Sequence, residues 1–181
     1  MDAGPDHRWW DDRPRLVVAL TVAIALHNFE EWLAFPRVGE PFGALLRSWG
    51  VAVSLPPWPI MQAGLAGATL VPIALLWIAG RGGRLWWKDA ILAGVAAVFL
   101  VNVMVPHLIA GIIVGGYAPG LVTALFLNLP VCSLMIRHVA RAGLLTPARL
   151  RAAMMLGALA LPLTTGTLLL LAALFHRGGG A

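Results

Sequence analysis

Charged residues are scarce in this chain of 181 residues and make up only 12% of it, whereas hydrophobic residues reach 60%. An average soluble domain carries about twice that share of charge. The composition excludes an intrinsically disordered chain and argues against a soluble globular domain, because so short a chain cannot bury that much apolar surface in its own core. A second apolar phase must cover it, so we predict a single multi-pass membrane domain over 1–181, with the lipid bilayer as its partner.

Cysteine is almost absent as well. The single Cys132 excludes an internal disulfide and any metal site built from several cysteines. Because Cys132 lies in the middle of a hydrophobic run, we predict a small buried apolar side chain rather than a reactive thiol. The net charge of +5 requires no nucleic-acid partner, since it comes mostly from basic residues in the loops predicted to be cytoplasmic.

Long stretches hold few or no charged residues, and each predicts a spanning helix of about 20 residues. The gap at 90–136 is long enough for two such helices, and Gly115-Gly116-Tyr117-Ala118-Pro119-Gly120 separates them, because glycine and proline interrupt helices. We therefore predict an all-α integral membrane bundle of five transmembrane helices, at about 15–35, 59–80, 89–114, 119–138 and 152–175. The segment between 37 and 58 predicts a short interfacial helix between spans one and two.

Lys and Arg are unevenly distributed over the loops of this topology. Ten of them fall on the N-terminal side of the membrane, and three fall on the other side. Cytoplasmic loops carry the excess of positive charge in membrane proteins. We therefore predict a multi-pass protein of the bacterial inner (plasma) membrane, with its N-terminus in the cytoplasm and its C-terminus outside.

Three ionisable side chains lie within the first predicted span. Each costs about 2.5–3.5 kcal/mol in the hydrocarbon core on insertion scales. His27, Glu30 and Glu31 are spaced i, i+3 and i+4, so they share one face of the helix. The adjacent carboxylates repel each other and can both ionise only beside a cation. Since ionisable residues inside a membrane are functional by default, this cluster predicts a site.

A second polar group is predicted in span three. Pro106 lacks a backbone N–H, so the carbonyl of Asn102 loses its helical partner. We expect the helix to open between Asn102 and His107 and to form a polar pocket there. At a rise of about 1.5 Å per residue, Glu31, His107 and Asn128 all fall in the outer half of the bilayer, which allows them to meet.

The segment His27-Asn28-Phe29-Glu30-Glu31 resembles the signature of the HXXEE family of bacterial integral membrane proteins. Asn102 with His107, and Tyr117-Ala118-Pro119-Gly120, resemble the later motifs of that family. The likeness covers about 17–130. It implies a compact multi-helix membrane domain and no settled activity.

Two imidazoles and a carboxylate are suitable ligands for a divalent transition metal, either zinc or non-haem iron. The predicted metal ligands are His27, Glu31 and His107. Glu30 would then act as general base on a bound water, with Asn102 and Tyr117 orienting groups beside it. The predicted catalytic residues are therefore Glu30, Glu31, Asn102 and Tyr117, and the predicted pocket residues are Asn28, Gln62, Thr123 and Asn128.

The leading hypothesis is a membrane-embedded, metal-dependent hydrolase. A site at this depth is reached most readily from the lipid, so the expected substrate is a lipid or a lipid-linked molecule. The alternatives are a small transporter or proton-relay protein, and a structural membrane protein with a non-catalytic polar cluster. The spacing of Gly111 and Gly115 fits helix packing within one chain or between chains, so the oligomeric state stays open.

Overall fold

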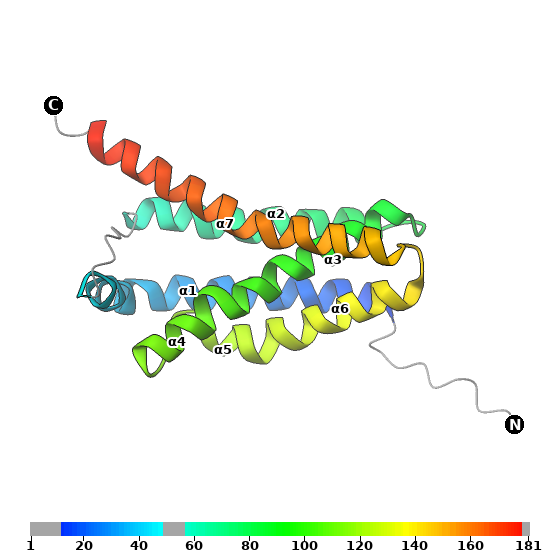
Figure 1. Cartoon of the computed structure of the whole chain (residues 1–181), viewed down its shortest axis with the longest axis horizontal. Helices are drawn as coiled ribbons and strands as arrows, with labels where there is room; N and C mark the ends of the chain where they lie inside the picture. Colours follow the sequence, from blue (N-terminus) through cyan, green and yellow to red (C-terminus); the bar gives the residue numbers. More distant parts are fainter. Residues whose placement is uncertain (1–11, 49–56, 179–181) are drawn as a thin grey trace, which may run out of the picture.

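Helices make up all the regular structure in the computed structural model, which describes residues 12–48 and 57–178 (Figure 1). The elements are α1 (Arg13–Ser48), α2 (Trp58–Gly80), α3 (Trp86–Asn102), η2 (Val103–Leu108), α4 (Ile109–Val114), α5 (Leu121–Thr123), η3 (Ala124–Asn128), α6 (Leu129–Ala142) and α7 (Pro147–Gly178). The turns of η3 are of the π type and wider than those of an α-helix. In η2 two helical segments meet at a kink, because the φ of −131° and ψ of 101° at Val105 are not helical. No strand occurs within the described ranges, so the predicted all-α fold is confirmed.

Four helical stretches are long and apolar enough to cross a membrane: Arg13–Arg37, Trp58–Gly80, Trp86–Val114 and Leu121–Ala142. They correspond to the first four predicted spans, with ends that differ by a few residues. The third consists of α3, η2 and α4, and the fourth of α5, η3 and α6. Helix α7 covers the predicted fifth span, but its crossing of a membrane, and therefore the count of five, stays a prediction.

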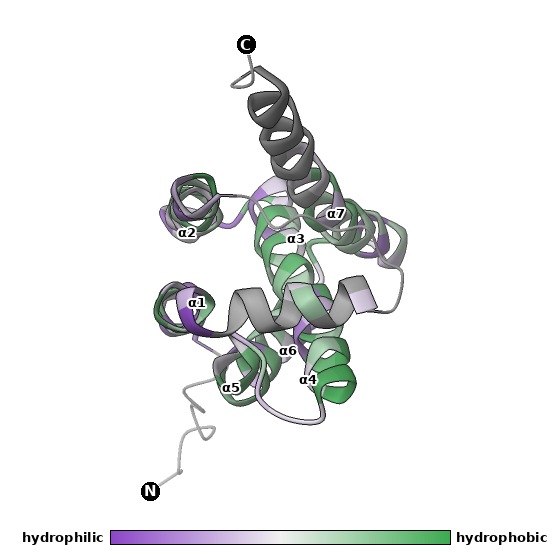
Figure 2. Ribbon diagram, turned by 90° about the vertical axis from the view of Figure 1, so that its left-hand side faces the viewer, coloured by the Kyte–Doolittle hydropathy of each residue, from purple (hydrophilic) through white to green (hydrophobic). Residues whose placement is uncertain are grey.

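The outer surfaces of the helices are apolar. In the view along the bundle, α3 lies in the middle, with α1, α2, α6 and α7 around it (Figure 2). Large apolar side chains point outward and are two-thirds or more exposed at Leu70, Ile112, Phe126 and Leu156. A surface of this kind is stable in the hydrocarbon of a bilayer, which supports a membrane protein.

The segment between spans one and two differs from the prediction. Helix α1 continues past the end of the first span to Ser48, so it takes up about half of the segment in which a separate interfacial helix was expected. Residues 49–56 lie outside the described residues. The separate interfacial helix is therefore not confirmed.

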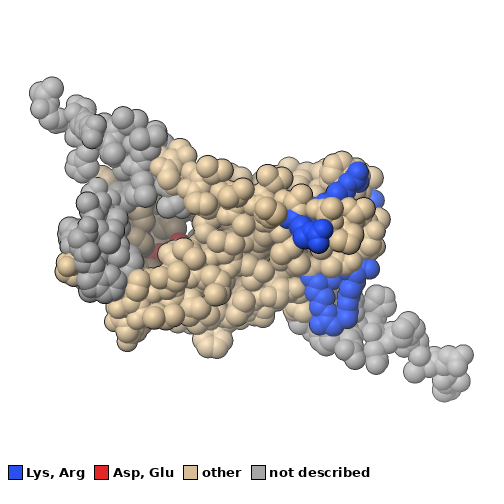
Figure 3. Space-filling model, viewed as in Figure 1, with Lys and Arg blue, Asp and Glu red and all other residues tan. Residues whose placement is uncertain are grey.

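Basic residues gather at one end of the bundle. The chain order places the start of α1, the end of α2, the start of α3, the end of α6 and the start of α7 at this end (Figure 1). Figure 3 shows the Lys and Arg atoms of the viewed face concentrated there. The residues involved include Arg13, Arg15, Arg81, Arg84, Lys88, Arg137, Arg141, Arg149 and Arg151.

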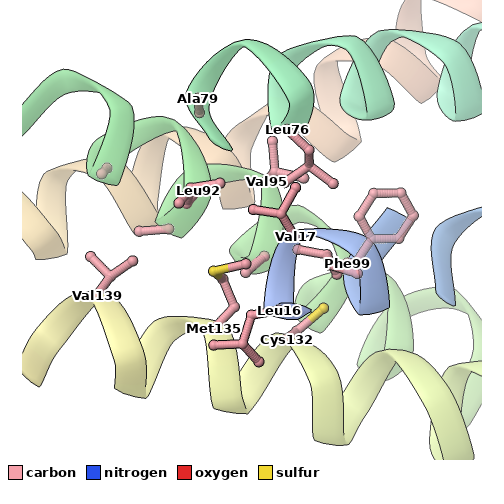
Figure 4. Packing of buried hydrophobic residues seen from close by; sticks show 14 of the residues in the cluster. Leu16, Val17, Leu76, Ala79, Leu92, Val95, Phe99, Cys132, Met135 and Val139 are labelled. Atoms are coloured by element: carbon pink, nitrogen blue, oxygen red, sulfur yellow. The ribbon is translucent and has the colours of Figure 1, made fainter. Parts of the chain in front are cut away.

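The apolar core lies between α1, α2, α3 and α6 (Figure 4). Leu16 and Leu20 of α1 are completely buried against Leu92 of α3 and its neighbours. Cys132 of α6 is also fully buried within this cluster, where it packs as an apolar side chain. The core thus fixes the relative rotation of these four helices. This rotation also sets which way the polar side chains at the end opposite the basic residues face.

Glycines allow two close helix contacts. A Cβ atom at Gly157 of α7 would lie 2.2 Å from the carbonyl oxygen of Gly94 on α3, so the two backbones touch directly. A Cβ at Gly111 would lie 2.8 Å from Cδ2 of Leu121. Gly111 therefore serves packing within the chain, whereas Gly115 has a φ of +66° and ends α4.

A buried ion pair ties three helices together at the basic end. Nη1 of Arg13 lies 2.8 Å from Oδ1 of Asp89, and the two side chains are 9% and 1% exposed. The same guanidinium donates through Nη2 to the carbonyl of Ala79 at 2.7 Å. Arg84 approaches the second oxygen of Asp89 at 3.3 Å. The carboxylate thus links the start of α1 to the start of α3, and Arg13 links both to the end of α2.

Replacing Asp89 by Asn leaves the buried Arg13 without its counter-charge. We expect the Asp89→Asn variant to lose about 3–5 kcal/mol of unfolding free energy. The matched control is Asp12→Asn, which removes an ion pair with Arg15 whose side chains are 32% and 65% exposed, and which should cost less than about 1 kcal/mol. Reversible unfolding in mixed micelles measures both. Equal losses would contradict the role of the buried pair.

Candidate functional site

Two histidines from distant parts of the chain meet inside the bundle. His27 of α1 and His107 of η2 are buried, with 0% and 2% of their surfaces exposed. The centroids of their rings lie 4.7 Å apart, and the ring planes are nearly perpendicular at 86°. Phe99 of α3 packs edge-on against the ring of His27 at 6.3 Å. The structure therefore forms a pair of imidazoles shielded from bulk water.

The kink in η2 brings His107 into this position. Residues five apart on an ideal α-helix lie about 140° apart around the axis, so Asn102 and His107 would face different ways. Pro106 cannot donate to the carbonyl of Asn102, and Val105 leaves the helical conformation with φ −131° and ψ 101°. As a result Nδ2 of Asn102 lies only 3.0 Å from Nε2 of His107. The expected opening of the helix between these two residues is confirmed.

One nitrogen of each imidazole is held by the segment that follows α4. Nδ1 of His107 lies 2.7 Å from the carbonyl oxygen of Pro119, which can only accept, so Nδ1 carries the hydrogen. Nδ1 of His27 lies 3.0 Å from Oγ1 of Thr123, whose own hydrogen is directed to Glu30 at 2.5 Å. His27 therefore also donates from Nδ1. Both neutral rings are left with a lone pair on Nε2.

The two Nε2 atoms point toward one carboxylate oxygen. Oε1 of Glu31 lies 3.3 Å from Nε2 of His107 and 3.9 Å from Nε2 of His27. One ligand atom from each of these three residues falls within 4.8 Å of the others, close enough to hold a metal ion. The side chain of Glu31 is 16% exposed, so the cluster is shielded but reachable. Figure 3 shows acidic side-chain atoms inside a hollow far from the basic end.

Asn102 lies between the imidazoles. Its Nδ2 is 2.9 Å from Nε2 of His27 and 3.0 Å from Nε2 of His107. The amide group has two hydrogens and can therefore donate one to each lone pair. Asn102 is thus the residue that connects the two histidines directly.

Glu30 turns away from Glu31 although the two are adjacent in sequence. Its Oε2 accepts from the backbone N–H of Thr123 at 2.8 Å and from the hydroxyl of the same residue. Its Oε1 accepts from Tyr117 at 2.8 Å and more weakly from the N–H of Val122 at 3.4 Å. The donors Val122 and Thr123 lie in α5, at the start of the fourth helical stretch, where a carboxylate is favourable. Glu30 therefore fixes Thr123, which in turn orients His27.

Tyr117 contacts the site through its hydrogen bond to Glu30. It lies in the turn between α4 and α5 and is 45% exposed. Desolvation and its hydrogen bond to Glu30 raise the pKa of Tyr117 to about 12, so the phenol keeps its proton at neutral pH. A groove of about 360 Å³ begins beside this pair and is lined by Glu30, Leu33, Ala34, Arg37 and Tyr117. It lies along the outer part of α1, with Glu30 as the site residue in its lining.

Gly120 forms one wall of the cluster and is absent from the predicted site residues. A Cβ atom there would lie 2.7 Å from Cε1 of His107, 2.9 Å from Cε1 of His27 and 3.0 Å from Cγ of Glu31. Its φ of +78° also favours glycine. The only signal in the sequence was its place after Pro119, in a stretch identified as a turn and as part of a motif.

The other predicted pocket residues differ in their surroundings. Thr123 belongs to the hydrogen-bonded site. Asn28 instead donates to Thr69 of α2 at 2.8 Å, so it ties α1 to a neighbouring helix. Gln62 is half-buried on α2 and forms no hydrogen bond to the cluster among the described residues. Asn128 is fully buried, and its amide atoms have no hydrogen-bond partner within the described part of the chain.

Comparison with known proteins finds a family whose model spans the cluster. The family model described as "Protein of unknown function with HXXEE motif" matches residues 18–135, which include every residue of the cluster. The uncharacterized protein YrkK of Bacillus subtilis (strain 168) is 33% identical over 119 residues, which cover 63% of this chain and 68% of the relative. No solved structure matches the chain.

Replacing Gly120 by Ala should lower the unfolding free energy by more than backbone strain alone explains, because the added methyl group would collide with the cluster. Gly143 has a similar φ of +71°, but a Cβ there would meet nothing within 4 Å. We therefore expect Gly143→Ala to cost about 1–2 kcal/mol of unfolding free energy, from the left-handed conformation alone. Gly120→Ala should cost about 1–3 kcal/mol more because of overpacking. Denaturant unfolding of both variants checks this, and equal losses would contradict the contact with the imidazoles.

Proposed function

The chain belongs to the family of proteins with the HXXEE motif, and for this member we propose that His27, Glu31 and His107 hold a divalent transition metal inside the membrane. The observation that carries the proposal is that Oε1 of Glu31 lies 3.9 Å from Nε2 of His27 and 3.3 Å from Nε2 of His107, two nitrogens that carry no hydrogen. Acceptors that fix Nδ1–H of a ligating histidine are the usual outer neighbours of a metal site. Thr123 and the carbonyl of Pro119 have that position here.

Two imidazoles and one carboxylate suit zinc or non-haem iron. The 2-His-1-carboxylate set is common to non-haem iron sites, and zinc accepts the same ligands. A bound divalent ion also relieves the electrostatic problem of Glu31, whose carboxylate lies in a nearly buried site beside two neutral rings. The metal is therefore favourable for the fold as well as for chemistry.

We propose hydrolysis of a lipid or lipid-linked substrate as the reaction. A bound metal would supply an acidified water molecule and polarise a carbonyl or phosphoryl oxygen. The groove beside Glu30 and Tyr117 supports access for an amphiphile, since Leu33 and Ala34 line it together with the cation of Arg37. Because Glu30 already accepts from Thr123 and Tyr117, we assign it to positioning Thr123 rather than to the role of general base.

The same proposal includes the topology in the membrane. We propose five spans, with α7 as the fifth, an interfacial segment after span one and a bacterial inner-membrane location. The basic end would face the cytoplasm, together with the N-terminus, and the C-terminus would lie outside. The gathering of basic residues at one end supports this orientation. The metal site would then lie in the outer half of the bilayer.

A proton relay is a second candidate, and one observation favours it. Hydrogen bonds connect Tyr117, Glu30, Thr123 and His27 in one chain from the exposed turn to the buried imidazoles. Such chains of titratable groups mark proton pathways in membrane proteins. A relay needs no metal, so metal analysis separates the two functions. A purely structural cluster would show neither metal binding nor proton flux.

Metal analysis tests the proposed ligands. Purified protein loaded with Zn²⁺ or Fe²⁺ should hold one ion per chain, and Glu31→Gln and His107→Ala should each abolish stoichiometric binding. The matched control is Glu30→Gln, which changes the neighbouring carboxylate and should keep one ion with affinity lowered by no more than about 100-fold. Elemental analysis and calorimetric titration provide the readout. A wild-type protein without metal under all loading conditions would exclude the metal centre.

Reconstituted protein tests the reaction. In proteoliposomes of bacterial lipids, the wild type should release a hydrolysis product detectable by mass spectrometry, and a chelator should stop the release until metal is restored. Glu31→Gln should lower the rate by about 100-fold or more. Protein that retains its metal but turns over no lipid would exclude the hydrolase and leave the metal centre intact. Proton flux without metal dependence would favour the relay.

A further inference from the structure

A metal ion between the histidines would break the hydrogen bonds that the side chain of Asn102 forms. Without an ion, its amide nitrogen donates to the Nε2 lone pairs of His27 and His107 at 2.9 and 3.0 Å. Those lone pairs are the ones that the proposed metal centre requires. An ion held between the two rings would bind both lone pairs, and its positive charge would repel the N–H groups of the amide. The side chain of Asn102 must then reorient.

A half-turn of the terminal amide resolves the conflict. The oxygen and nitrogen of an asparagine amide are nearly identical in size, so rotation about the Cβ–Cγ bond exchanges them without moving the helix. Oδ1 then lies where Nδ2 lies now, and an acceptor faces the cation. We propose that Asn102 is the fourth protein ligand of the metal through Oδ1; this inference rests on the proposed metal centre.

Four of the six distances between the four atoms are close to those of a four-coordinate site. A tetrahedral zinc with bonds of about 2.0–2.1 Å has ligand atoms about 3.3 Å apart. Here the amide position lies 2.9 Å from Nε2 of His27 and 3.0 Å from Nε2 of His107. Oε1 of Glu31 lies 3.9 and 3.3 Å from the same two nitrogens. These separations lie on both sides of the tetrahedral value, so small side-chain shifts complete the site.

The local backbone supports a ligand at this position. Asn102 is the last residue of α3, directly before η2, the kinked segment that carries His107. The half-buried side chain of Asn102 and the buried ring of His107 are thus fixed by one short segment, with His27 and Glu31 arriving from α1. A neutral amide oxygen is also a weaker ligand than imidazole or carboxylate. It can therefore give way to water or a substrate oxygen, which a catalytic metal requires.

A thiol at position 102 provides the test. The wild type and the Asn102→Cys and Asn28→Cys variants are loaded with Zn²⁺ and measured by X-ray absorption. Only Asn102→Cys should show a sulfur ligand, at about 2.3 Å. Asn28 is the matched control because it is another buried asparagine of the first motif, but its amide bonds to Thr69 on α2. Cys132 is present in all three proteins and contributes the same background.

Each outcome decides between the two claims. If the Asn102→Cys variant binds zinc with nitrogen and oxygen ligands only, Asn102 is not a ligand. The proposed metal centre is not affected by that result. A wild type that binds no zinc would overturn both. If Asn102→Cys fails to fold, the isosteric Asn102→Asp variant replaces it: zinc affinity should rise about 10-fold or more over the wild type, as expected for a carboxylate ligand. An unchanged or lower affinity would overturn the assignment.

Discussion

Every polar group inside an apolar phase needs a partner, and this constraint organises the site. The two buried histidines satisfy it in the same way, since each gives its Nδ1 hydrogen to an oxygen of the α4–α5 region. That choice leaves both Nε2 lone pairs directed at the same small volume. Gly120 makes the arrangement possible, because a side chain there would collide with both rings.

The two ends of the bundle have different physical tasks. At the basic end, the buried pair of Arg13 and Asp89 joins the starts of α1 and α3 to the end of α2. The apolar core between α1, α2, α3 and α6 holds the helices in place between this end and the polar site. At the polar site, the kink in η2 interrupts regular helical hydrogen bonding and allows His107 to face inward. Proline is a usual cause of such a kink.

Much of this could be predicted from the order of residues alone. The charge-free stretches predict the first four spans, since a bilayer requires about 20 apolar residues in a row. Pro106 predicts the break between Asn102 and His107, because the chemistry of proline is local. The continuation of α1 to Ser48 and the partner of Asn28 were not predicted. The partner of Asn28 depends on a contact with a helix that is distant in sequence, through its bond to Thr69 on α2.

Hydropathy and residue spacing can be read along the chain, so the order of residues was enough to indicate which apolar stretches carry ionisable groups. Three-dimensional packing was needed to show that Glu31 faces the imidazoles while its neighbour Glu30 binds Thr123 of α5. Adjacent residues on a helix point about 100° apart, so a single choice of helix rotation separates their roles. That rotation is set by side-chain packing among several helices, which no local pattern contains.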